Sequence, residues 1–356
     1  MQGLFFDCRY IRLDHHDGIS RFSAGLFSAL SKLTEVTAIV SDLRQLEKLP
    51  TGTVFVKVSA PTSILEPLVA LQINKAGAKV VFSPMQTIGS LGRKFKLVLT
   101  VHDLIYYRHP SPPPGFSIPI RSLWRLYHLV FWPQRLLLNR ADAVAAVSET
   151  TRDLIAQNRL TRRPVRVVYN AADDSEQFSA PTHRPAKNQS LVYMGSFMDY
   201  KNVEVLIKGM AFLPDYELNL LSRISTSRKL ELESLVPKGA KVIFHNGVAE
   251  SDYHKLLSDS VALVTGSQDE GFGIPLVEAM SRGIPVVISD IAIFREIAGA
   301  AGIYFDQNNP ASFAEAVKSI GENASWLKNS RAAQEQAGKF SWSRSAETLL
   351  ETLKQI

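Results

Sequence analysis

The sequence predicts an α/β protein built from two Rossmann-like, doubly wound domains that face a cleft. Its 356 residues are too many for one ordinary core and fit two domains. Short β-rich runs alternate with helical patterns along almost the whole chain, which is typical of parallel α/β layers. A polar, proline-containing stretch at about 173–188 interrupts this alternation, which then starts afresh. We therefore expect an N-terminal domain at 1–172, a linker at 173–188, a second domain at 189–338, and a C-terminal helix at 339–356 that packs back on the first domain.

Seven β-rich runs define the sheet expected in the first half of the chain. They are GLFFDC (3–8), EVTAIVS (35–41), TVFVKVS (53–59), AKVVFSP (78–84), KLVLTVHD (96–103), ADAVAAVS (141–148) and PVRVVYN (164–170). Helical patterns fill the intervals between these runs, so parallel strands joined by crossover helices are expected. Ligands of such sheets bind beyond the carboxyl ends of the strands, and His102 lies at the end of the fifth run, after KLVLT.

Six further runs define the second sheet. They are LVYMGS (191–196), ELNLLS (217–222), KVIFHNG (241–247), VALVTGS (261–267), PVVISD (285–290) and GIYFD (302–306). Polar residues follow two of them, at 196–201 and at Glu270. The chemistry of this domain is therefore expected at those strand ends.

Composition limits the class of protein. With 46% hydrophobic and 21% charged residues, the chain has the composition of a soluble globular protein. Its single cysteine, Cys8, excludes a disulfide framework and suits a reducing compartment. The N-terminus does not read as a secretory signal, and no apolar run is long enough to span a membrane, so we expect a cytoplasmic protein. A net charge of +6 favours anionic partners without choosing among them.

The stretch DEGFGIPLVEAM, residues 269–280, combines an anion site with two carboxylates. Pro275 suits the first turn of a helix that Gly283 ends, and the two preceding glycines allow close approach of a ligand. We expect uncapped amides here that can hold a phosphate, namely those of Phe272, Gly273, Ile274, Leu276 and Val277. Glu270 and Glu278 would repel a diphosphate, so if they serve a ligand they face its neutral hydroxyls. A sugar nucleotide meets this requirement. The alternative is that Glu278 only stabilises the first turn of the helix through the helix dipole, and that Glu270 is an ordinary charged residue of a loop.

Several segments, in order along the chain, give the sequence a wider resemblance. It resembles the retaining glycosyltransferases of family 4, which have the GT-B fold, and among them mannosyltransferases. The matching segments are DGISRF (17–22), TVHDL (100–104), AVSETTRDLI (146–155), VVYN (167–170), YMGSFMDYKNVEVLI (193–207), the paired glutamates of EGFGIPLVE (270–278) and SDIAIFREIAG (289–299). Two positions depart from the family pattern, since Ala171 follows Asn170 and Ser196 stands where some relatives have arginine.

This resemblance implies a role for each matched residue. Lys201 and Ser196 lie in the phosphate-binding region, Glu270 binds the hexose and Glu278 the ribose, and the base contacts the backbone near Val248. In the first domain, Gly18 belongs to the donor-binding glycine loop and His102 lies near the reacting centre. The implied catalytic residues are His102, Lys201 and Glu270, and the implied substrate is a nucleotide sugar, with GDP-mannose as the leading donor. The chain has no Asp-x-Asp pair, so we expect no metal or other cofactor, with Lys201 and helix amides neutralising the diphosphate.

The stretch from Leu104 to Ala141 contains no acidic residue, although it holds five arginines and seven aromatic residues. Arg121, Arg125 and His128 recur at helical spacing and share one face. Basic and aromatic residues together suit a membrane surface with anionic lipids, which would accompany a glycan or lipid-linked acceptor and peripheral association with the cell membrane. The alternative is an amphipathic helix whose aromatics pack into the first domain.

Other functions remain open at this point. A nucleotide-sugar epimerase or hydrolase of the same fold would turn over without an acceptor, and a non-catalytic sugar-binding protein would bind the donor without transfer. A dinucleotide-dependent oxidoreductase is excluded, because neither first strand leads into a G-x-G-x-x-G turn. Nucleic acid is not an expected partner, since the sequence contains no nucleic-acid-binding module.

Overall fold

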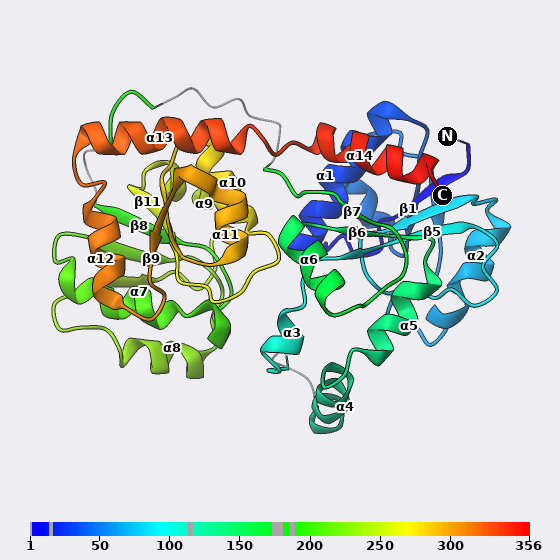
Figure 1. Ribbon diagram of the computed structural model, residues 1–356, viewed down its shortest axis with the longest axis horizontal. Coiled ribbons are helices and arrows are strands. Elements are labelled where there is room, and N and C mark those ends of the chain that lie inside the picture. Colours follow the sequence, from blue (N-terminus) through cyan, green and yellow to red (C-terminus); the bar gives the residue numbers. More distant parts are fainter. Residues whose placement is uncertain (1, 14–16, 113–116, 173–180, 186–188) are drawn as a thin grey trace. The chain divides into compact units, whose positions relative to one another are not determined.

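A computed structural model describes residues 2–13, 17–112, 117–172, 181–185 and 189–356. The chain forms two compact units, Met1–Ala171 with Ser341–Ile356, and Ala172–Phe340 (Figure 1). Each unit contains one parallel sheet with helices, so the predicted α/β class with two doubly wound domains is confirmed. Of the predicted linker, residues 173–180 and 186–188 lie outside the described part of the chain.

The first unit is built on a seven-stranded parallel sheet in the order β3-β2-β1-β4-β5-β6-β7. The strands are β1 (Leu4–Asp7), β2 (Thr37–Val40), β3 (Phe55–Lys57), β4 (Val80–Ser83), β5 (Lys96–Val101), β6 (Ala143–Ala146) and β7 (Val165–Val167). The order reverses between β1 and β4. Such a switch point leaves a crevice at the carboxyl ends of the strands, where ligands of doubly wound sheets bind.

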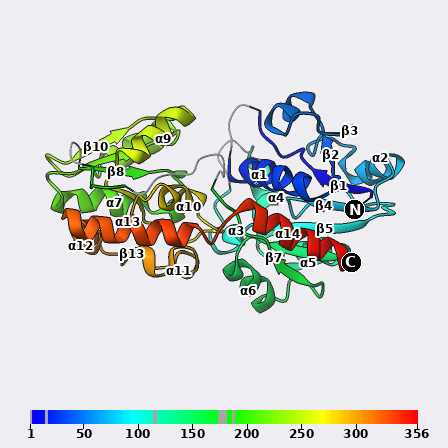
Figure 2. The same cartoon turned by 90° about the horizontal axis from the view of Figure 1, so that it is seen from above.

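Helices cover both faces of this sheet (Figures 1 and 2). They are α1 (Gly18–Leu33), η1 (Leu43–Lys48), η2 (Glu66–Leu68), α2 (Val69–Lys75), α3 (Ile105–Arg108), α4 (Ile118–His128), α5 (Trp132–Arg140), α6 (Glu149–Gln157) and α14 (Trp342–Lys354). On one face, rings of α1 pack on strand residues, with Phe27 5.5 Å from Phe6 between ring centroids. On the other face, apolar residues of α2, α5 and α6 close a second core.

The C-terminal helix α14 packs along α1 and so belongs to the first unit. Trp342 lies edge-on to Phe22, with 6.0 Å between the ring centroids. A Cβ atom at Gly25 would lie 2.4 Å from the Trp342 indole, so only glycine fits at this point of α1. The last helix is therefore part of the core of a unit that begins more than 300 residues earlier.

The second unit has a six-stranded parallel sheet in the order β10-β9-β8-β11-β12-β13. Its strands are β8 (Ser190–Tyr193), β9 (Glu217–Leu220), β10 (Lys241–Phe244), β11 (Ala262–Thr265), β12 (Val286–Ser289) and β13 (Gly302–Phe305). Its helices are η3 (Asp199–Lys201), α7 (Val203–Gly209), η4 (Met210–Phe212), α8 (Thr226–Glu233), α9 (Glu250–Ser258), α10 (Ile274–Ser281), α11 (Ala292–Ala298), η5 (Gly299–Ala301), α12 (Pro310–Lys318) and α13 (Asn323–Ala337). Here the strand order reverses between β8 and β11, which predicts the crevice of this unit at their carboxyl ends.

None of the helices in the described residues is both long enough and apolar enough to cross a membrane.

Candidate functional site

Lys201 and Glu270 meet at the switch point of the second sheet. Lys201 ends η3 in the loop after β8, and Glu270 lies in the loop after β11, the neighbouring strand. The lysine Nζ lies 2.5 Å from Glu270 Oε1, which also accepts a hydrogen bond of 3.2 Å from Ser267 Oγ. The backbones of the two loops are joined as well, since the Gln268 amide donates to the Tyr200 carbonyl at 2.7 Å. The fold therefore brings together two predicted site residues that are 69 positions apart.

The loop between β8 and Lys201 rests on a buried tyrosine. The hydroxyl of Tyr193 donates to the carbonyl of Ser196 at 2.6 Å, and burial together with the nearby Glu270 raises the pKa of this tyrosine well above its ordinary value. A Cβ atom at Gly195 would lie 2.8 Å from the same hydroxyl, so the loop needs glycine there. Ser196 is exposed at the surface of the loop. Tyr193 thus fixes the path by which the chain reaches Lys201.

Helix α10 begins with a glycine that no other residue replaces easily. Gly273 is its N-cap with φ 94° and ψ 58°, in the left-handed region, and it has no side chain to cap the helix. Amides at the first turn of a helix lack partners within the helix and attract anions. One part of the prediction is wrong: the amide of Leu276 already donates to the Gly273 carbonyl at 3.0 Å, because the first turn is tight. Of the other predicted amides, that of Gly273 belongs to the N-cap and those of Ile274 and Val277 to the first turn, whereas Phe272 precedes the N-cap.

Glu278 lies on α10 and is buried, with 4% of its surface exposed. Its Oε2 accepts a hydrogen bond of 2.7 Å from the hydroxyl of Tyr253, which comes from α9. The Tyr253 hydroxyl therefore fixes the position of this carboxylate on α10. Tyr253 did not stand out in the sequence, because a tyrosine within a helical pattern reads as a core residue.

The predicted base contact at Val248 follows Gly247, which also has a positive φ, of 98°. Arg223 packs over this glycine, since a Cβ atom there would lie 2.8 Å from Arg223 Cγ. The Gly247 amide donates to the carbonyl of Leu221 at 2.9 Å, which joins the turns after β9 and β10. A guanidinium therefore lies beside the backbone where we expect the base.

In the first unit, His102 lies directly after β5 and is held by the backbone. Its Nε2 lies 2.7 Å from the carbonyl oxygen of Pro84. A carbonyl can only accept, so Nε2 carries the proton and, in the neutral ring, Nδ1 is left as an acceptor. Burial lowers the pKa of His102, although the Pro84 contact and the charges of Asp103 and Asp17 act in the opposite direction. His102 is therefore a neutral imidazole at pH 7.

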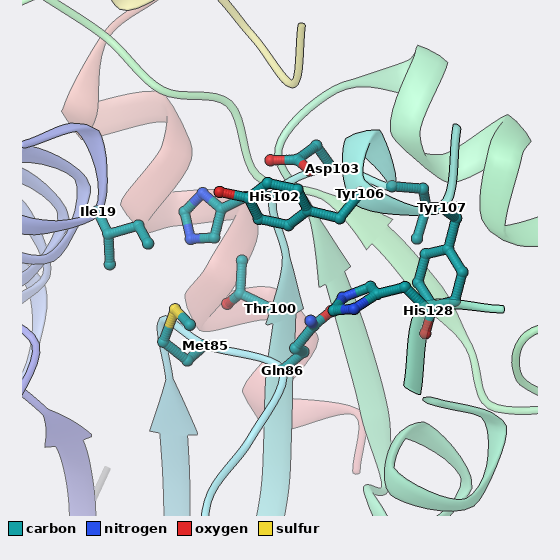
Figure 3. Close-up of a pocket in the computed structure, with 10 residues that line it drawn as sticks. Ile19, Met85, Gln86, Thr100, His102, Asp103, Tyr106, Tyr107 and His128 are labelled. Carbon is teal, nitrogen blue, oxygen red and sulfur yellow. The ribbon is translucent and has the colours of Figure 1, made fainter. Parts of the chain in front are cut away.

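A pocket of about 130 Å³ opens beside His102 (Figure 3). Ile19 of α1 forms one side of it, and Tyr106, Tyr107 and His128 form the other. Gly18 is the first residue of α1, and the side chain of Asp17 caps this helix by accepting from the Ser20 amide at 2.8 Å. The predicted glycine loop is thus a helix start, although residues 14–16 before it lie outside the described range. At this volume the pocket is smaller than a typical ligand site of roughly 300–1,000 Å³ and suits one sugar ring.

The acid-free stretch forms α3, α4 and α5, and its aromatic residues pack on one another. His128 Nδ1 donates to the Trp124 carbonyl at 2.8 Å, and its ring contacts Trp124, Tyr106 and Tyr107. Tyr107 and Phe131 also pack against the core of the first unit, so this part of the aromatic cluster is packed as the second of the two interpretations predicts. What the sequence analysis missed is that several leucines of α4 are exposed as well, as with Leu123 at 68%.

Two family models match the chain. The model described as "Glycosyl transferases group 1" matches residues 174–340, and the model described as "Glycosyltransferase Family 4" matches residues 67–176. The first covers the second unit with its Lys201–Glu270 pair, and the second covers much of the first unit, including His102.

Relatives with curated names include mannosyltransferases. The chain is 28% identical over 324 residues to the O-antigen chain mannosyltransferase RfbU of Salmonella typhimurium, a match that covers 85% of this chain and 87% of the relative. It is 36% identical over 120 residues to the serotype-specific mannosyltransferase WbdA of Escherichia coli, covering 33% of this chain and 14% of that much longer protein.

Solved structures share the fold over the whole chain. Anabaena HepE, in a crystal structure with UDP and glucose, matches with a TM-score of 0.73 at 17% identity and covers 99% of this chain and all of its own. WaaG, described as a glycosyltransferase involved in lipopolysaccharide biosynthesis, matches with a TM-score of 0.68 at 16% identity, covering 98% of this chain and 99% of its own. The likeness to these structures shows that the chain has the GT-B fold.

Proposed function

Because the chain belongs to glycosyltransferase family 4 and has the GT-B fold, we propose that it transfers mannose from GDP-mannose to a glycan or lipid-linked acceptor. The names of RfbU and WbdA support mannose as the transferred sugar. We further propose that the transfer retains the anomeric configuration and needs no metal, and that the protein acts in the cytoplasm at the inner face of the cell membrane.

The observation that carries the proposal is the Lys201–Glu270 pair at the switch point of the second sheet. The ammonium of Lys201 supplies a positive charge for the diphosphate, and the amides at the start of α10 add their partial charges. Glu270 is next to the lysine, so it is suited to hydroxyls of the hexose that the diphosphate carries. Glu278, fixed by Tyr253, is suited to a ribose hydroxyl.

In the proposed reaction, the acceptor hydroxyl oxygen forms a bond to the anomeric carbon on the face from which the diphosphate leaves. The bond between that carbon and the phosphate oxygen breaks, and the hydroxyl proton passes to the leaving phosphate. Negative charge grows on the diphosphate as the bond breaks, so Lys201 stabilises the transition state more than the bound donor. His102, as a neutral acceptor at Nδ1, is suited to orient a sugar hydroxyl.

A panel of nucleotides in a thermal unfolding experiment tests the donor. A ligand at about 100 times its Kd adds about 2.7 kcal/mol to the free energy of unfolding, which shifts the melting temperature measurably. We expect GDP and GDP-mannose to stabilise the protein and UDP to have little effect. If UDP stabilises the protein and GDP does not, the donor is a UDP-sugar and not GDP-mannose. If mannose is released from GDP-mannose at full rate without an acceptor, the protein is a hydrolase and not a transferase.

A further inference from the structure

We propose that Gln86 is a specificity-determining residue for the acceptor sugar, because its side-chain amide donates a hydrogen bond to one oxygen of a hexose in the His102 pocket. We further propose that Gln134 is the positioning residue that orients this amide. The proposal deepens the proposed function, on which it rests, since it assigns the pocket of the first unit to the sugar that receives mannose. All the residues that carry it belong to the first unit.

A buried glutamine of α5 lies behind the wall of the pocket. Gln134 is 1% exposed, although glutamine is mostly a surface residue. Its Oε1 accepts a hydrogen bond of 3.0 Å from the Tyr107 hydroxyl, and its Nε2 donates one of 2.5 Å to Oε1 of Gln86. An apolar side chain of similar size would avoid the cost of burying an amide. A glutamine at this position therefore indicates a role in placing Tyr107 and Gln86.

These two hydrogen bonds determine which end of the Gln86 amide is left for the pocket. Gln86 and Tyr107 both line the pocket (Figure 3). Because the Tyr107 hydroxyl donates to Oε1 of Gln134, the atom of Gln134 that faces Gln86 is Nε2, a donor, and Gln86 meets it with its amide oxygen. Among the residues that the structure describes, Nε2 of Gln86 has no hydrogen-bond acceptor. This NH₂ group is therefore left to donate to a ligand.

Two neighbouring strand ends hold Gln86 and His102 in a fixed relation. Gln86 lies in the segment after β4, and His102 directly follows β5, which pairs with β4. The Thr100 hydroxyl donates to the carbonyl of Ser83 at 2.8 Å, and Nε2 of His102 lies 2.7 Å from the carbonyl oxygen of Pro84. The backbone that leads to Gln86 is thus tied to the strand that carries His102.

The pocket therefore presents two hydrogen-bonding groups of opposite kind. Nδ1 of the neutral His102 accepts from a sugar hydroxyl, whereas Nε2 of Gln86 donates to a sugar oxygen. A few placed polar groups in a pocket set the orientation of its ligand and its specificity. Stereoisomeric hexoses differ in the direction of single hydroxyls, so two fixed groups select among them. A site built to bond a substrate hydroxyl also rejects analogues that lack it.

Calorimetric titration with simple sugars tests this selectivity. The methyl α-glycosides of glucose, galactose and mannose are each titrated into the full-length protein in the presence of GDP. We expect one of them to bind more tightly than the other two. A parent protein that binds none of the three, or binds all three equally, would overturn the assignment of the pocket to a selected hexose.

Substitution of Gln86 tests its role as a donor. Gln86→Leu removes the amide, and Gln86→Glu keeps an oxygen for Gln134 but replaces the NH₂ group by a second oxygen. Each should lower the affinity for the preferred glycoside about three- to tenfold, which corresponds to one neutral hydrogen bond, and should leave GDP affinity unchanged. The matched control is Gln157→Leu, since Gln157 is exposed at the end of α6 in the same unit. A loss of GDP affinity instead of glycoside affinity would overturn the assignment to the acceptor.

Gln134→Leu separates positioning from stability. The leucine leaves no polar atom in the core, and the half-buried Tyr107 and Gln86 can bond to water instead. We expect a melting temperature within a few degrees of the parent, with a weaker preference for the favoured glycoside. Tyr107→Phe, which removes the donor that orients Gln134, should weaken the preference as well. A melting temperature lowered by more than about 10 °C with unchanged preference would make Gln134 a structural residue and overturn its positioning role.

Modified sugars determine which end of the Gln86 amide reaches the ligand. Fluorine in place of a hydroxyl can accept a hydrogen bond but cannot donate one, and hydrogen in its place can do neither. At the hydroxyl that Gln86 recognises, the fluoro sugar should bind the parent more tightly than the deoxy sugar, and Gln86→Leu should remove this difference. At the hydroxyl that His102 recognises, both sugars should bind equally weakly. If no position favours fluorine over hydrogen, Gln86 does not act as a donor and the proposal is wrong.

Transfer from GDP-mannose keeps this proposal distinct from the proposed function. The glycoside that binds most tightly should also be the preferred acceptor. Selective binding without transfer to any of the glycosides would count against mannosyl transfer and leave the Gln86 site standing. Transfer at equal kcat/KM to all three glycosides would overturn the Gln86 site and leave the transfer standing.

Discussion

At the scale of single residues, Lys201 is partly neutralised by Glu270 when no donor is bound, since Nζ and Oε1 are 2.5 Å apart. Glu270→Gln should release the lysine charge, so we expect GDP to bind as tightly as to the parent or more tightly, while the transfer rate falls. Glu278→Gln should weaken GDP binding, because the ribose loses a carboxylate acceptor. Isothermal titration with GDP separates the two effects, and an equal loss of GDP affinity in both variants would falsify this division of roles.

Lys201→Ala should lower the transfer rate more than it weakens donor binding, because the charge on the leaving phosphate grows in the transition state. Loss of one such electrostatic contact typically costs about 10²–10³ in kcat. Steady-state kinetics with GDP-mannose measure kcat and KM separately. In the same assay EDTA should leave the parent unaffected, and a requirement for magnesium or manganese would show that a metal rather than Lys201 neutralises the diphosphate.

His102 gives a prediction about pH. Burial lowers its pKa below the ordinary value of 6.5, so the ring stays neutral as the pH falls through that value. If Nδ1 must accept a hydrogen bond from a sugar hydroxyl, transfer should remain constant through pH 6.5 and decline only at lower pH, as the ring gains its proton. His102→Gln should be slower but should lack that decline, because glutamine does not titrate. A parent profile that falls with a midpoint above pH 6.5 would contradict this role.

The sequence predicted the residues that carry charge and missed those that position them. Lys201, Glu270 and Glu278 follow from motifs at strand ends, and the sheet order explains why the first two meet. Tyr253 could not be predicted, because its contact with Glu278 joins α9 to α10 through tertiary packing. The exposed leucines of α4 were missed for a similar reason, since apolar residues of a helix are normally buried and only the structure shows which of them are exposed.

At the scale of elements, the start of α10 depends on the backbone of Gly273. Its φ of 94° is a conformation that alanine adopts at a cost of roughly 1–2 kcal/mol. Gly273→Ala should therefore lower stability by about that amount, and it should also raise KM for the donor, because the amides of the first turn move. Gly239→Ala is the matched control: its φ is 84° in the same unit, and nothing lies within 4 Å of the added methyl group.

Thermal unfolding and donor kinetics of the two variants give the comparison. Both should lose similar stability, and only Gly273→Ala should lose donor affinity. If the two variants have the same KM as the parent, the turn before α10 is a structural feature and not part of the donor site.

The sequence predicted the strands well, because each buried parallel strand is a short apolar run between helical patterns. Each of the thirteen predicted runs overlaps a strand, from Leu4–Asp7 to Gly302–Phe305. The finer geometry of helix starts was predicted less well. Gly18 begins a helix rather than lying in a loop, and the Leu276 amide donates a hydrogen bond within its own turn. Both details depend on local φ and ψ angles, which the periodicity of the sequence does not predict.

At the scale of the whole molecule, the two units differ in how the chain builds them. The second unit is one continuous segment, Ala172–Phe340, whereas the first needs the last residues of the chain, Ser341–Ile356. The amphipathic pattern of those residues predicts a helix but cannot say which surface it covers. That surface is α1, which has a glycine at position 25 where Trp342 approaches.

Removal of 341–356 should therefore unfold the first unit and leave the second intact. The deletion takes away four buried apolar side chains, those of Trp342, Ala346, Leu349 and Leu353, and exposes Phe22 beneath them. Large buried side chains contribute about 2–5 kcal/mol each, so their sum approaches the whole stability of a typical domain, about 5–15 kcal/mol. In calorimetry, the shortened chain should lose one transition, and GDP should still raise the temperature of the remaining one. Adding the 341–356 peptide in excess should restore the lost transition, whereas Trp342→Phe in the full chain should only lower it. A shortened chain that keeps both transitions would show that α14 covers a unit that is already stable without it.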